Sequence, residues 1–163
     1  MKLQLRRVLR QSVLVLASVP ALFVAAPVHA IDAFMAIATI PGDSVVKGHE
    51  REIVLTGYSQ SFATRACSRV VANKRIDVAS PGLISAATGN VTLPVVVITL
   101  AQPSGDGLVN FYRATLNSVQ IDRIEVAEQG DELVERVVLA PKSYKIEYFP
   151  PGITPTVSNF TCP

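Results

Sequence analysis

Apolar and polar residues alternate along much of the chain, and this alternation predicts β-strands. In residues 144–148, aromatic and aliphatic side chains alternate with a lysine and a glutamate, and residues 108–116 follow a weaker version of the pattern. Because successive side chains of a strand point to opposite faces, each such segment has one buried and one hydrated face. The pattern predicts six or seven strands, at about 32–38, 51–62, 67–76, 92–100, 108–116, 118–127 and 132–148.

Glycine, proline and small polar residues mark the turns between these segments. They cluster at 41–44, 103–107 and 129–131, and Pro141-Lys142 predicts a bend or a break in the last strand. Pro94 cannot donate a backbone hydrogen bond, so we expect it at an edge, at a bulge or at the start of its strand.

One segment departs from the alternation and predicts a short helix over residues 80–89. Ser80 is a good capping residue, Pro81 suits the first helical turn, and Gly89 suits a left-handed position at the C-terminal end. The fold class is therefore mainly β, a closed barrel or a sandwich, with one short helix. Residues 150–163 contain four prolines and are expected to lie extended across the surface.

The first 30 residues have the features of a secretory signal peptide. Four basic residues precede position 11, residues 12–27 are almost entirely apolar, and Val28-His29-Ala30 supplies small residues at a cleavage site. A single membrane anchor is the alternative, but the apolar run contains two prolines and is shorter than the ~20 residues of a spanning helix. We expect cleavage after Ala30 and a secreted or periplasmic product without a stable membrane anchor. Arg6-Arg7 also raises twin-arginine export, although no Ser or Thr precedes the pair, which favours the Sec route.

The net charge of +2 over 163 residues comes from this leader, because residues 31–163 carry 11 basic and 13 acidic side chains. A mildly acidic domain removes the main reason to expect nucleic acid as a partner. We interpret the acidic positions of the 125–135 hairpin as solvated: Glu125, Glu128, Asp131, Glu132 and Glu135. The basic residues of one strand region could share a surface: Arg65, Arg69, Lys74 and Arg75.

No catalytic or metal-binding constellation can be drawn from residues 31–163. His49 is the only histidine there, and neither a C-x-x-C pair nor a G-x-S-x-G elbow is present. Gly105-Asp106-Gly107 lies between strands, where its acid would repel a phosphate. We interpret His49, in a charged loop with a glycine, as a solvated side chain. The expectation is a protein that is not an enzyme and has no cofactor and no metal site.

Cys67 and Cys162 are a candidate disulfide, because an even cysteine count in an exported chain favours pairing. The bridge would close a loop of about 95 residues and, in the chain-entropy model, would contribute up to ~4.7 kcal/mol. Two buried free thiols are the alternative.

Several motifs, taken in order, resemble the haemolysin-coregulated protein (Hcp) family of type VI secretion tube proteins. The first are AIDAFM at 30–35, IPGDS at 40–44 and KGHE at 47–50. KRIDVASP at 74–81, followed by Leu83, is similar to the family's signature before its single helix. YKIEY at 144–148 is similar to its final strand. The resemblance covers about residues 31–149, between the leader 1–30 and the tail 150–163.

The resemblance implies a compact two-sheet β-barrel with a helix on its flank. It also implies homohexameric rings that stack into a tube whose lumen can carry small effectors, with secretion-machine components as further candidate partners. Such assembly needs heterologous, head-to-tail contacts. The candidate stacking residues lie in two segments: Pro41, Gly42, Asp43, Ser44, Lys47, Gly48, His49 and Glu50 in the first, and Ser61, Thr64 and Arg65 in the second.

The chain also departs from the family pattern. Members of the family usually lack a signal peptide and often have Trp in the second strand, whereas this chain has a leader, Gly57-Tyr58-Ser59-Gln60 and no Trp. The tail with Cys162 is additional. Two hypotheses follow: a structural or secreted tube-family protein that acts by assembly, and an exported Hcp-like binding module outside the tube.

Overall fold

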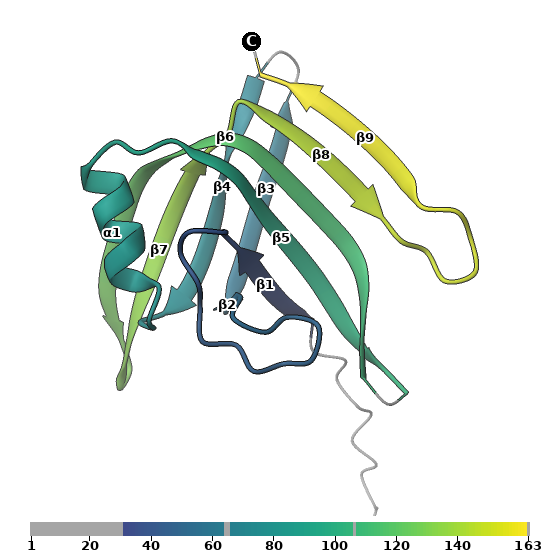
Figure 1. Cartoon of the computed structure of the whole chain (residues 1–163), viewed down its shortest axis with the longest axis horizontal. Helices are drawn as coiled ribbons and strands as arrows, with labels where there is room; N and C mark the ends of the chain where they lie inside the picture. Colours follow the sequence, from purple (N-terminus) through teal and green to yellow (C-terminus); the bar gives the residue numbers. More distant parts are fainter. Residues whose placement is uncertain (1–30, 64–65, 106, 163) are drawn as a thin grey trace, which may run out of the picture.

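The computed structural model describes residues 31–63, 66–105 and 107–162, and these residues form nine strands and one helix (Figure 1). The elements in chain order are β1 Asp32–Ala36, β2 Ile53–Leu55, β3 Gly57–Ala63, β4 Ala66–Arg75, α1 Ser80–Thr88, β5 Leu93–Ser104, β6 Gly107–Gln129, β7 Glu132–Ala140, β8 Ser143–Tyr148 and β9 Thr156–Thr161. The signal-peptide prediction for residues 1–30 lies outside the described residues.

All strand pairings are antiparallel and follow one path, β2-β1-β5-β6-β7-β4-β3, with β8 on β6 and β9 on β8. The path bends into two layers because β6 pairs with β5 and β8 in one sheet and with β7 in the other. Its two ends, β2 and β3, are consecutive in the chain and are joined at Thr56, whose N–H donates to the Asn73 carbonyl oxygen at 2.8 Å. No β2–β3 ladder is present among the described strands, so the sheet is not closed by strand pairing between its two ends.

The core lies between the two layers and confirms the mainly β prediction with one helix on the flank. The alternating positions of β1, β5, β6 and β7 fill it, and α1 adds Leu83 and Ala86 from the side that faces the sheet. The largest fully buried apolar side chains are Phe34, Met35, Ile53, Leu83, Ile98, Leu116 and Leu139. Burial of such side chains stabilises each by roughly 1.5–3 kcal/mol relative to an exposed position.

The predicted strands are present, but several boundaries differ. The segment expected at 51–62 is divided at Thr56, the expected pair 108–116 and 118–127 is one strand, and the long last strand is split at Pro141-Lys142 as predicted. β6 stays continuous because Ser118 takes a left-handed conformation with φ 48°, which turns the strand from one layer into the other. Pro94 lies at the start of β5, one of the three places expected.

The ends of α1 correct two of the sequence-based assignments. Ala79, not Ser80, occupies the N-cap position, and no side chain caps the helix there. Pro81 lies in the first turn as expected. Gly89 has φ −80°, and the left-handed residue is the next one, Asn90, with φ 50°. Asn is one of the few residues other than glycine that often adopts this conformation, and here Asn90 Oδ1 accepts a hydrogen bond from Gln120 Nε2 at 3.3 Å.

The tail is more regular than expected. Its residues 156–161 form β9, which pairs with β8 along its whole length rather than lying on the surface without partners. Among the described residues, no helix combines the length and the apolar character that crossing a bilayer requires.

Candidate functional site

A buried ionic cluster lies where β4 leads into α1. The Lys74 ammonium lies 2.7 Å from Glu135 Oε2 and 2.7 Å from Asp77 Oδ1, and it also donates to Ser80 Oγ at 2.9 Å. Ser80 Oγ donates in turn to Glu135 Oε2 at 2.8 Å. The Lys74 and Glu135 side chains are fully buried. These contacts overturn the prediction that Lys74 belongs to a surface group and that Glu135 is solvated.

Cross-strand register brings this cluster together. Lys74 of β4 lies opposite Glu135 of β7, so both side chains point into the barrel, and the Asp77–Ser80 turn closes over them. Asp77 Oδ1 also accepts the Ala79 N–H at 2.9 Å, which stabilises the start of the helix. A buried charge is stable only when it is paired and hydrogen-bonded, so the cluster fixes the position of α1 relative to both strands.

Residues 37–52, the loop between β1 and β2, form a self-supported platform. Gly42 N–H donates to Arg51 O at 2.7 Å, Arg51 N–H donates to Ser44 O at 2.8 Å, and Ser44 N–H donates to Glu52 O at 3.1 Å. These bonds hold the two arms of the loop together in the manner of a short hairpin. At Gly42 a Cβ would lie 2.2 Å from the Glu52 carbonyl oxygen, so only glycine permits this approach.

His49 anchors the platform to the barrel, which corrects its interpretation as a solvated histidine. Its ring stacks on Phe34 of β1 with centroids 4.1 Å apart and planes at 5°. Its Nδ1 lies 2.8 Å from Glu52 Oε2, and its Nε2 lies 2.9 Å from Asn110 Oδ1 of β6. The residue is only 4% exposed, because the loop folds back over the aromatic ring of Phe34.

The predicted stacking residues of this loop divide into buried anchors and an exposed rim. Gly42, Ser44 and His49 are buried, and their contacts hold the loop. The exposed positions are Pro41, Asp43, Val45, Lys47, Gly48 and Glu50. Backbone hydrogen bonds from Glu50 and Gly48 lower the pKa of the Glu50 carboxyl, which therefore stays ionised on the rim. Val45, which sequence reasoning did not single out, is 90% exposed at the tip.

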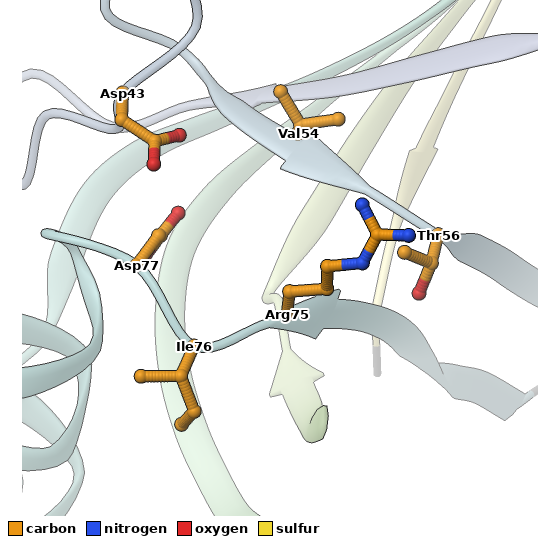
Figure 2. A pocket seen from close by; sticks show the side chains of 6 residues that line it. All are labelled: Asp43, Val54, Thr56, Arg75, Ile76 and Asp77. Atoms are coloured by element: carbon orange, nitrogen blue, oxygen red, sulfur yellow. The ribbon is translucent and has the colours of Figure 1, made fainter. Parts of the chain in front are cut away.

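A pocket of about 230 Å³ lies between the platform and the start of α1 (Figure 2). The Asp43 side chain comes from the platform, and Arg75, Ile76 and Asp77 come from the end of β4 and the turn after it. The remaining lining residues are Val54 and Thr56. The Asp77 carboxylate is already bonded to Lys74, so the pocket offers an apolar wall with charges at its margin rather than a reactive group.

Of the second predicted stacking segment, the structure describes Ser61, near the end of β3 that lies away from the platform (Figure 1). Phe62 follows it on the same strand. Phe62 is 55% exposed, and its ring lies 5.5 Å from that of Phe160. Thr64 and Arg65 lie outside the described residues, as does the side chain of Cys67, so the predicted disulfide stays a prediction.

A group of hydroxyl and amide side chains also lies inside the barrel, at Tyr58, Gln60 and Tyr112. Tyr58 and Tyr112 both donate to Gln60 Oε1 inside the barrel, and burial raises the pKa of the Tyr58 hydroxyl far above its ordinary value. This shift opposes ionisation, so Tyr58 is not a base at neutral pH. No group of three or more His, Cys, Asp or Glu residues suited to a metal ion lies among the described residues.

We predict that Lys74→Met strongly destabilises the fold. The substitution leaves two carboxylates in the cluster without their cation, and breaking a buried pair in this way costs about 3–5 kcal/mol. Urea unfolding of Lys74→Met measures the loss. Lys142→Met, at an exposed position, is the matched control and should change the free energy of unfolding by less than about 0.5 kcal/mol. Equal stabilities of the two variants would contradict the assigned role.

We also predict that Gly42→Ala opens the platform. The added methyl group meets backbone atoms of Glu52 and Ile53, and such overpacking costs about 1–3 kcal/mol. Hydrogen exchange should show faster exchange at the Ser44 and Arg51 amides. Gly107→Ala is the control, since nothing lies within 4 Å of its added Cβ. Unchanged protection in Gly42→Ala would show that the loop adapts without cost.

Comparison with solved structures gives the same architecture at low sequence identity. Hcp1 from Salmonella typhimurium superposes with a TM-score of 0.76 at 20% identity, over 81% of this chain and 94% of that one. A type VI secretion system effector from Yersinia pestis superposes with a TM-score of 0.73 at 20% identity, over 80% of this chain and 99% of that one. The secreted protein Hcp3 from Pseudomonas aeruginosa superposes with a TM-score of 0.71 at 23% identity, over 82% of this chain and 99% of that one. At these identities the superpositions establish the fold.

Family membership follows from the sequence itself. No curated protein matches the chain at the threshold applied. The sequence model of the type VI secretion system effector family Hcp matches residues 34–148, which include the platform, the buried cluster and α1. The chain therefore belongs to the Hcp family of type VI secretion system effectors.

Proposed function

We propose that this chain is a non-enzymatic structural protein that acts by assembling into rings and stacking them. The observation that carries the proposal is the rigid, exposed platform at one end of a barrel of the Hcp family. A head-to-tail contact needs two different surfaces, and Ser61 of the second candidate segment lies near the end of β3 away from the platform. Homohexameric rings, other secretion-machine components and small effector cargo are the partners that family membership suggests.

The platform has the properties of a docking element. Its anchors are buried, so its tip is presented without the loss of entropy that an unstructured loop would undergo on binding. Val45 is 90% exposed, and the same loop carries exposed residues of both signs of charge, Asp43, Lys47 and Glu50. An apolar centre with a polar rim is the usual composition of a protein–protein interface.

A second candidate function is an exported Hcp-like binding module that is not part of the tube. Two features beyond the segment matched by the family model favour it: the leader-like residues 1–30 and the tail with β9. Export after cleavage at Ala30 would place Cys67 and Cys162 in an oxidising compartment, where a disulfide persists. Cys162 is partly buried against the core, at the end of β9.

We predict that Val45→Asp abolishes stacking and leaves the individual ring intact. The substitution places a charge at the centre of the proposed contact, where it would have to be desolvated. Electron microscopy and light scattering of the chain from residue 31 onward should show rings without stacks. Ile153→Asp, at another strongly exposed apolar position, is the control and should stack like the parent. A parent chain that is monomeric at all concentrations would contradict ring assembly and favour the binding module.

Intact mass analysis of the exported protein tests the second candidate. We predict a chain that begins at Ile31 and is lighter by two hydrogen atoms under non-reducing than under reducing conditions. The bridge should also raise the free energy of unfolding, so reductant should lower that free energy for the parent and leave it unchanged for Cys162→Ala, which has no bridge. A full-length chain in the cytosol with two free thiols would contradict export.

A further inference from the structure

The outer edge of β9 is an unpaired sheet edge among the described strands. β9 (Thr156–Thr161) pairs with β8 over six residues without a register shift, and it pairs with no other strand among those described. It also lies beyond residue 148, where the match to the family model ends.

The alternation of hydrogen-bonded pairs along the β8–β9 ladder shows which backbone groups of β9 point away from the sheet. The Cys162 N–H donates to Lys142 O at 2.9 Å, and these two residues continue the β8–β9 register. Hydrogen-bonded pairs alternate along an antiparallel ladder, so Phe160, Ser158 and Thr156 also direct their N–H and C=O groups toward β8. The alternate residues Val157, Asn159 and Thr161 direct theirs outward, away from the sheet.

This edge lacks the features that normally prevent strand pairing. Proteins protect edge strands with charges, prolines, bulges or covering segments. Residues 150–163 contain no charged side chain, and no proline interrupts 156–161. All six residues of β9 are exposed, including Val157 at 46% and Phe160 at 44%.

We propose that β9 pairs antiparallel with β9 of a second copy of this chain, about a two-fold axis at Asn159. In this register Val157 lies opposite Thr161 of the other copy and Asn159 lies opposite its own counterpart. All three outward residues of each strand then exchange hydrogen bonds. The strand is self-complementary, because it brings no like charges together and aligns polar and β-branched side chains.

A second copy fits this edge better than an unrelated peptide does. An isologous contact requires one surface to be its own complement, and an uncharged strand with its outward groups centred on one residue meets that requirement. The two-fold contact differs from the head-to-tail contact proposed for rings, so it would link two rings or two monomers. It does not depend on the ring hypothesis.

The decisive experiment uses opposite charges at the proposed axis. Asn159→Asp lies opposite Lys145 within the same chain, so its own β8–β9 pairing is retained, but two copies would bring two carboxylates together. We expect Asn159→Asp, and separately Asn159→Lys combined with Lys145→Glu so that its own cross-strand pair stays opposite in charge, to weaken self-association at least tenfold in sedimentation velocity. An equimolar mixture of the two should restore it. Thr154→Asp, on the exposed segment before β9, is the control and should associate like the parent.

Amide exchange gives a second readout that does not depend on any variant. In the parent chain, the Val157, Asn159 and Thr161 amides should become protected as concentration rises, while those of Ser158 and Phe160 stay protected throughout. The proposal fails if the three outward amides exchange rapidly at every concentration. It also fails if they become protected only when another protein is added, or if the charge-swapped mixture does not associate. Loss of stacking in Val45→Asp would leave each of these results unchanged.

Discussion

The burial of a single ammonium group organises one end of this molecule. Lys74 reaches into the barrel from β4, and burial without partners would be prohibitively costly. Two carboxylates and a hydroxyl surround it, and they come from β7 and from the turn before α1. The helix can therefore begin at only one place relative to the sheet. The pocket beside the platform is shaped by the same turn, because Asp77 belongs to both.

A buried side chain also fixes the position of the platform, here through aromatic and polar contacts rather than an ion pair. His49 joins the loop to β1 through Phe34 and to β6 through Asn110. The side chains closest to the barrel are thus committed to structure, and the exposed rim remains for contacts with other molecules. The two ends of the molecule differ in character, with a mixed-charge rim at one and the aromatic Phe62 at the other. A head-to-tail contact between copies of the chain requires two ends that differ in this way.

Alternation predicted the strands well, because it reports a local property, the burial of every second side chain. It could not show that Lys74 and Glu135 face each other inside the barrel, since that contact depends on the β4–β7 register. The burial of His49 was missed for the same reason, as its partner Asn110 lies 61 residues away. The helix was found from Pro81, but its ends were displaced, because Ser80 bonds to the buried cluster and not to the helix N-terminus. The family motifs indicated the platform, but not which of its residues are exposed.

The left-handed Ser118 allows one strand to belong to both layers. Since side chains alternate with a period of two, the register of β6 against β5 and its register against β7 each determine which face of β6 is buried, and the two must agree across the bend at Ser118. One strand therefore links the register of one layer to the register of the other.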